Sequence, residues 1–220
     1  MKYLKFYLVA FLIILLDQSL KLWVHHHMEF GTAGEIPIFG NWFKLHYTIN
    51  EGMAFGIKLG EEYGKLILTF FRIVAVIAIG YYVYYLVKKK YPQAYIWCIS
   101  LILGGAVGNV IDSVFYGVFL EGNASYYPSE EEPWLYPWFH GKVIDMFYLD
   151  IWQGYLPENI PLIGGSYIFL WPIFNVADSS IFIGVCIILL FQRKFFVSST
   201  ETTQIAESSK HHGNNTTVGT

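Results

Sequence analysis

Four long apolar stretches set the pattern of this chain. They run over residues 7–24, 66–87, 94–118 and 168–191, and only a few polar side chains interrupt each of them. A helix of roughly 20 apolar residues crosses the hydrocarbon core of a bilayer. We therefore expect an all-α membrane protein built on a bundle of four transmembrane helices.

The two long segments between the predicted helices carry their own signals. Phe43, Leu45 and Tyr47 alternate with polar neighbours, which is the period of a β-strand. We expect a small external β-sheet and loop platform at the membrane surface. From residue 198 to residue 220 the chain is polar and has no periodicity, so we expect a disordered tail after a four-span domain over residues 1–197.

The composition agrees with a membrane protein. Of the 220 residues, 55% are hydrophobic and 14% are charged, whereas soluble domains carry about 25% charged residues. The formal net charge of −3 leaves no basic footprint for nucleic acid. Cys98 and Cys186 lie within apolar stretches, and we interpret them as buried thiols.

The basic residues outside the spans predict the orientation of the chain. They cluster at residues 2–5, 88–90 and 193–194, which a four-span chain places on one side of the membrane. Loops rich in Lys and Arg favour the cytoplasmic side. We therefore expect both termini in the cytoplasm and the loops over residues 25–65 and 119–167 outside.

Ionisable residues inside a span are functional candidates, because they are expensive to bury in lipid. Asp17 and Lys21 lie one helical turn apart on one face, so they either form an ion pair or orient a neighbouring element. Arg72 lies in the second span, where it either reaches the interface or pairs with an acid on another span.

The third span combines small residues with polar ones. Ser100, Gly104, Gly108 and Asp112 follow one another at intervals of four, which forms a stripe that lets another helix approach closely. Asn109 and Asp112 share one face near the external end. This stripe predicts tight helix packing beside a polar site.

Two further carboxylates suggest a chemistry. Asp178 lies in the fourth span, three residues after Asn175, and Asp145 lies in an apolar segment after the second external loop. Two buried carboxylates that lie close together share one proton, which is the arrangement of aspartic proteases. On chemistry alone, Asp112 or Asp17 would serve equally well as a partner.

Five blocks in a fixed order carry a resemblance to a known family. They are similar to the patterns Asp-Gln-x-x-Lys, Asn-x-Gly-x-Ala-Phe, Gly-Gly-Ala-x-Gly-Asn-x-x-Asp, Gly-x-Val-x-Asp-Phe and Phe-Asn-x-Ala-Asp-x-x-Ile. They occupy residues 17–21, 50–55, 104–112, 141–146 and 174–181. The chain resembles the bacterial lipoprotein signal peptidase family (signal peptidase II) over about residues 5–195.

The resemblance implies an aspartic endopeptidase of the bacterial cytoplasmic (inner) membrane, with its active site facing the outer side. The family removes signal peptides from prolipoproteins by cleaving before a cysteine that already carries diacylglycerol. The expected partners are this substrate and membrane lipid. We also expect binding of the cyclic peptide antibiotic globomycin, which targets the family, and we expect no metal or cofactor.

The fourth and fifth blocks assign the catalytic carboxylates to Asp145 and Asp178. The other blocks imply residues that bind substrate or support the site: Asp17, Lys21, Asn50, Gly52, Ala54, Gly108, Asn109, Asp112, Asn175 and Ala177.

The chain departs from the family pattern at three places. Ser113 stands where the family has arginine after the aspartate of the third block, and Arg72 and Lys142 are the cations we consider in its place. The link over residues 114–140 is long, and could be a lid, a partner contact or a plain surface insertion. Met146 replaces a usual phenylalanine.

Rival interpretations stay open at this point. A transporter or proton-coupled channel would also bury carboxylates. A zinc protease could use the histidines at residues 25–27 and His46, but the chain lacks an H-E-x-x-H motif. Ser19 and Lys21 point to different faces of a helix, which disfavours a Ser–Lys dyad, and Ser166 shows no partner. A purely structural protein of membrane assembly is the last alternative.

Overall fold

A computed structural model describes the chain except residues 1, 51–62, 124–136, 156–166, 171 and 215–220. Four long helices dominate the described part: α1 (Leu4–His27), α2 (Tyr63–Lys88), α3 (Gln93–Ile111) and α5 (Val176–Asn214). Each contains a segment that is long and apolar enough to cross a membrane. The prediction of four spans is confirmed.

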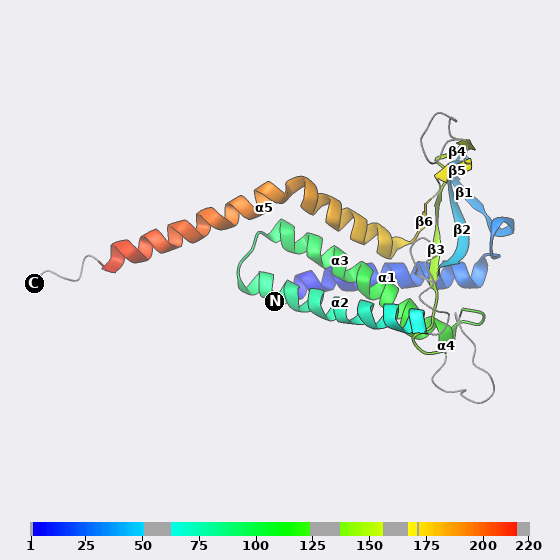
Figure 1. The fold of residues 1–220 in the computed structure, drawn as a ribbon, viewed down its shortest axis with the longest axis horizontal. Helices are drawn as coiled ribbons and strands as arrows, with labels where there is room; N and C mark the ends of the chain where they lie inside the picture. Colours follow the sequence, from blue (N-terminus) through cyan, green and yellow to red (C-terminus); the bar gives the residue numbers. More distant parts are fainter. Residues whose placement is uncertain (1, 51–62, 124–136, 156–166, 171, 215–220) are drawn as a thin grey trace, which may run out of the picture.

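Helix α3 lies at the centre of the bundle, in contact with α1, α2 and α5 (Figure 1). The glycines of α3 allow the neighbouring helices to approach closely. Gly104 lies against the backbone of Ala10 in α1, and Gly105 lies against the carbonyl oxygen of Ala177 in α5. Any larger side chain at these positions would push the helices apart. The small-residue stripe therefore does what the sequence predicts.

The outer faces of the helices are apolar. Phe70 and Phe71 of α2 are each 69% exposed, and Leu190 of α5 is 78% exposed. A water-soluble protein would not present such faces, whereas lipid tails solvate them at no cost. The exposure pattern therefore agrees with a bundle embedded in a bilayer.

The bundle is extended at one end by an antiparallel sheet of strands in the order β1-β2-β3-β6. The sheet lies at the end of α1 that is remote from the N-terminus (Figure 1). Its strands are β1 (Ile36–Phe39), β2 (Phe43–Asn50), β3 (Val143–Leu149) and β6 (Ile173–Phe174). The expectation of a small sheet is confirmed.

The remaining elements are short. A second pair of antiparallel strands consists of β4 (Trp152–Tyr155) and β5 (Tyr167–Leu170). The helical turn η1 (Thr32–Gly34) precedes β1, and α3 continues through a π-helical turn, η3 (Asp112–Tyr116), into α4 (Gly117–Phe119).

A buried cluster joins the sheet to the bundle. Val24 of α1 packs with Tyr47 of β2 and with Ile144 and Met146 of β3. Ile144 and Met146 have no exposed surface. The residue before Asp145 and the residue after it are therefore both buried in this cluster, which holds that part of β3 against α1.

The predicted start of the fourth span is wrong. The apolar stretch begins at residue 168, but Tyr167–Leu170 and Ile173–Phe174 form β5 and β6, and α5 starts only at Val176. Phe174 pairs with Phe147 of β3. Pairing to an existing strand overrides the local apolar run, because a short apolar segment suits a buried strand as well as a helix.

Helix α5 also extends further than the sequence suggests. It continues to Asn214, with a break in helical geometry at Phe191, and projects away from the other helices (Figure 1). The sequence predicts a disordered tail from residue 198. The disordered tail stays a prediction.

The glycine contacts predict the effect of one methyl group. Gly105→Ala places its Cβ on the carbonyl oxygen of Ala177, so α3 and α5 must separate. We expect a loss of about 1–3 kcal/mol of stability, measured by thermal unfolding in detergent. Gly80→Ala is the control, because its Cβ would lie 3.9 Å from Leu103 Cδ1, an ordinary contact. Equal unfolding temperatures for the two variants would contradict the packing described.

Candidate active site

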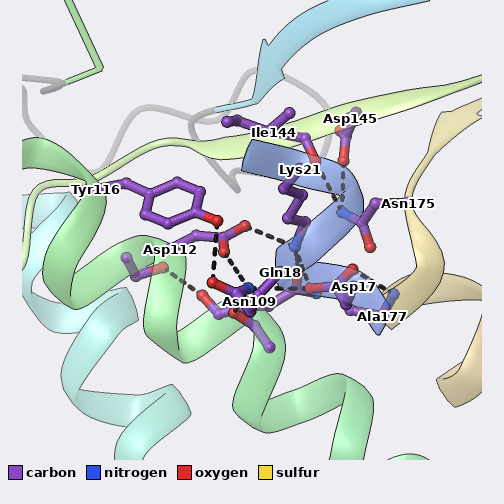
Figure 2. Close-up of polar contacts among 12 residues, drawn as sticks. Asp17, Gln18, Lys21, Asn109, Asp112, Tyr116, Ile144, Asp145, Asn175 and Ala177 are labelled. Carbon is purple, nitrogen blue, oxygen red and sulfur yellow. Dashed lines mark hydrogen bonds and ion pairs between the residues drawn. The ribbon is translucent and has the colours of Figure 1, made fainter. Parts of the chain in front are cut away.

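A buried lysine lies at the base of the site. Lys21 Nζ lies 2.8 Å from Asp17 Oδ2 and 2.7 Å from Asp112 Oδ2, and all three side chains are fully buried (Figure 2). Asp17 and Lys21 come from α1, and Asp112 begins the π-helical turn that follows α3. The expected ion pair within α1 is therefore present, and it extends to a second helix.

Two neutral side chains complete this cluster. Gln18 Nε2 donates to Asp17 Oδ2 at 3.1 Å and to Asp112 Oδ1 at 2.9 Å. Gln18 Oε1 accepts a hydrogen bond of 2.9 Å from the Tyr116 hydroxyl. Neither role was predicted from the sequence. The sequence held a signal for each residue, because Gln18 stands inside the first block and Tyr116 follows Asp112 by one helical turn.

The same cluster fixes the start of α5. Asp17 Oδ1 accepts a 2.9 Å hydrogen bond from the backbone N–H of Ala177. Asn175 Oδ1 accepts a 2.9 Å hydrogen bond from the backbone N–H of Asp178, which is the geometry of a helix N-cap. Asp178 is therefore held in place by its own backbone as well as by its neighbours.

Asp145 lies on β3 and is 2% exposed. Its Oδ1 accepts a 2.7 Å hydrogen bond from Asn175 Nδ2 (Figure 2), and its Oδ2 accepts a 3.1 Å hydrogen bond from Asn50 Nδ2. The pairing of β2 with β3 explains the second contact, since it places Asn50 opposite Val143. One amide, that of Asn175, thus binds Asp145 and caps the helix of Asp178.

Asp178 is half-buried and connects to the lysine cluster through α3. Its Oδ1 accepts a 2.9 Å hydrogen bond from Asn109 Nδ2. Asn109 Oδ1 in turn accepts a 3.3 Å hydrogen bond from Lys21 Nζ. The orientation of this amide is therefore set by the cation, which leaves its N–H group facing the carboxylate.

Asp145 and Asp178 lie in each other's electrostatic field. The pKa of Asp145 is raised from 3.8 to about 7, first because burial penalises its charged form and second because Asp178 is a nearby negative charge. Asp17 and Asp112, which the sequence left open as partners, are instead paired with Lys21. Asp145 and Asp178 are therefore the candidate pair.

A pocket of about 500 Å³ opens beside Asp178. Its other walls are almost entirely apolar: Leu149, Pro172, Phe174, Ser179, Phe182 and Ile183. Phe182 is 69% exposed on the outer face of α5. The pocket therefore joins a carboxylate to the surface that faces lipid.

The remaining candidates are placed as follows. Gly108 lies against the Asp17 carboxylate and Ala177, with room for no side chain. Gly52 and Ala54 lie outside the described residues. His25 and His27 contact the Tyr47 hydroxyl and the Trp23 carbonyl oxygen. Within the described ranges, no three His, Cys, Asp or Glu side chains are grouped so that they could hold a metal ion.

Comparison with known proteins places the chain in a family. The family model for signal peptidase (SPase) II matches residues 9–194. A lipoprotein signal peptidase of Amoebophilus asiaticus is 46% identical over 208 residues, which cover 93% of this chain and 85% of that protein. One of Porphyromonas gingivalis is 42% identical over 194 residues, which cover 83% and 81%.

Solved structures show the same fold. A bacterial membrane enzyme determined by the in meso method at 2.3 Å superposes with a TM-score of 0.54 and 24% identity, over 86% of this chain and 89% of that one. A second such structure, at 1.9 Å, gives a TM-score of 0.52 and 25% identity, over 84% and 90%.

The fold and the sequence relatives define a multi-pass membrane enzyme of the aspartic-peptidase type. The chain belongs to the signal peptidase II family. The resemblance drawn from the five sequence blocks is thereby confirmed.

The buried lysine makes a stability prediction. Lys21→Met leaves Asp17 and Asp112 without their cation, and breaking a buried pair in this way costs about 3–5 kcal/mol. We expect a large drop in the unfolding temperature in detergent, partly reversed by adding Asp112→Asn. Lys44→Met is the control, because Lys44 pairs with Glu35 on the partly exposed sheet. An unchanged unfolding temperature for Lys21→Met would refute the role given to this cation.

Proposed function

We propose that Asp145 and Asp178 form the catalytic dyad of an intramembrane endopeptidase. Its substrates are diacylglyceryl-modified prolipoproteins, which it cleaves before the lipidated cysteine. The observation that carries the proposal is the double use of Asn175, which binds the Asp145 carboxylate and caps the helix of Asp178. The relatives named lipoprotein signal peptidase support this class of substrate.

The two carboxylates have different roles in this mechanism. Asp145, with its raised pKa, is the neutral member and donates a hydrogen bond to the scissile carbonyl oxygen. Asp178 is the ionised member and takes a proton from water while the water oxygen bonds to the carbonyl carbon. The tetrahedral intermediate then breaks its C–N bond, and the leaving amine of the cysteine takes the proton from Asp178.

Neighbouring side chains position the substrate and the dyad. The Asn50 and Asn109 amides each donate to one catalytic carboxylate, so they fix its orientation and line the site. Ala177 sits at the helix start with its N–H bound to Asp17. We assign Asn175, Gly108 and the Asp17–Lys21–Asp112 cluster to support. From the family resemblance alone, we assign Gly52 and Ala54 of the second block to substrate binding.

The apolar pocket beside Asp178 fits a substrate that stays anchored in lipid. Its mouth includes Phe182 on the lipid-facing side of α5, so acyl chains remain in the bilayer while the peptide reaches the carboxylates. We place the enzyme in the cytoplasmic membrane, with both termini inside and the dyad towards the outer side. Basic residues at the bundle end opposite the sheet support this orientation. Globomycin is the inhibitor we expect at the same site.

The dyad predicts the result of a cleavage assay in detergent on a lipidated prolipoprotein. Asp145→Asn and Asp178→Asn each lower the rate by about 10³-fold or more, because neither half of the proton transfer works alone. Asp150→Asn, at the end of the same strand region as Asp145, keeps the wild-type rate.

Four results bear directly on the proposal. Cleavage of the lipidated substrate but not of its unlipidated form is expected, and EDTA leaves the rate unchanged because the mechanism uses no metal. Full activity in either catalytic variant would rule out the dyad. A folded wild-type protein that moves ions and cleaves nothing would instead favour the transporter interpretation.

The raised pKa of Asp145 predicts a pH dependence. The mechanism needs Asp145 protonated, so kcat/KM falls as the pH rises above about 7, where this carboxyl ionises. Initial rates across the stability range of the enzyme give the profile. A rate that stays constant well above neutral pH would contradict the assignment of Asp145 as the proton donor.

A further inference from the structure

Arg72 extends from α2 towards the active site. Its Nη1 donates a 2.8 Å hydrogen bond to the Ser113 hydroxyl oxygen, although the two residues lie 41 positions apart in the sequence. The guanidinium also interacts favourably with the negative charges of Asp112, Asp145 and Asp178. A cation on a lipid-facing helix thus has its charged group directed at the site rather than at the membrane surface.

Ser113 connects this cation to the site. Its side chain is fully buried, and its hydroxyl donates a 2.9 Å hydrogen bond to the backbone carbonyl oxygen of Asn109 while it accepts one from Arg72. The side chain of Asn109 donates to Asp178 Oδ1. A continuous path of contacts therefore runs from the guanidinium through Ser113 and Asn109 to Asp178.

The small size of Ser113 is necessary for this arrangement. The position is enclosed, with its backbone carbonyl bound by the N–H of Gly141 at 3.0 Å, so a long side chain here would take the space that the guanidinium fills. Ser113 is also the position where the sequence departs from the arginine of the family pattern. Of the two cations considered for this place, Arg72 is the one for which the structure gives a hydrogen bond to Ser113.

We propose that Arg72 is a positioning residue of the active site, and that α2 supplies through it the guanidinium that the family pattern places at position 113, in the π-helical turn η3 that follows α3. Positions 72 and 113 are then two alternative attachment points for one cationic group. The group holds Ser113 and Asn109 in register and faces the dyad with a positive charge. This inference rests on the proposed function of Asp145 and Asp178.

Relocation of the arginine is the direct test. The full-length enzyme is assayed as Arg72→Gln, Arg72→Lys and the double variant Arg72→Gln/Ser113→Arg. We expect Arg72→Gln to lower kcat about 10- to 100-fold with little change in KM, because misplacement of reacting groups acts on the chemical step. Arg72→Lys recovers part of the loss, since lysine keeps the charge but not the planar fork.

The double variant carries the decisive comparison. Ser113→Arg in the Arg72→Gln background returns the guanidinium from the other helix, and we expect kcat at least about tenfold above that of Arg72→Gln alone. Arg193→Gln is the matched control, because Arg193 is the other arginine of the chain and is exposed on α5. It should keep the wild-type kcat.

Each failure has its own signature. Wild-type kcat in Arg72→Gln overturns the inference, and so does a double variant that melts like the wild type but is no faster than Arg72→Gln. If Arg72→Gln does not fold, the comparison of Arg72→Lys with the double variant decides in the same way. Absence of cleavage by the wild-type enzyme would instead remove the proposed function, independently of Arg72.

Discussion

The structure depends on one buried cation. Lys21 is out of water between Asp17 and Asp112, and three charges in an apolar bundle are tolerable only if every one of them is paired. Pairing fixes the distance between α1 and the end of α3. Because the second oxygen of Asp17 binds the backbone of Ala177, the same cluster also fixes where α5 begins. Three helices are thus tied together directly beneath the carboxylates.

Side-chain amides connect this cluster to Asp145 and Asp178. Asn109 turns its oxygen to Lys21 and its nitrogen to Asp178, and Asn175 connects Asp145 to the first turn of α5. Asp145 and Asp178 come from a strand and a helix that are distant in sequence, so neither element could orient the two carboxylates alone. The sheet is needed for the same reason. Strand β2 brings Asn50 to Asp145, and the buried side chains of Ile144 and Met146 hold β3 on both sides of Asp145.

The sequence predicted the parts of the molecule that have a local signal. Apolar length identified four spans, and alternation at Phe43, Leu45 and Tyr47 identified β2. The start of α5 could not be predicted, because residues 168–170 and 173–174 are as apolar as a span. Only their pairing with β4 and β3, respectively, makes them strands. The sequence blocks identified the site residues, but they did not predict which of these residues contact one another. The hydrogen bond between Arg72 and Ser113 leaves no periodicity or spacing in the sequence that would predict it. It depends on how α2 packs against the end of α3.

The central claim is that the scissile bond lies between Asp145 and Asp178, and photo-crosslinking tests it most directly. A lipidated prolipoprotein with a diazirine on the residue before the lipidated cysteine is bound to the inactive Asp145→Asn enzyme and illuminated, and the adducts are located by mass spectrometry. The account predicts adducts within residues 141–150 and 174–183, with Asp178 the main site. Adducts confined to other parts of the chain, with none in these two segments, would contradict it.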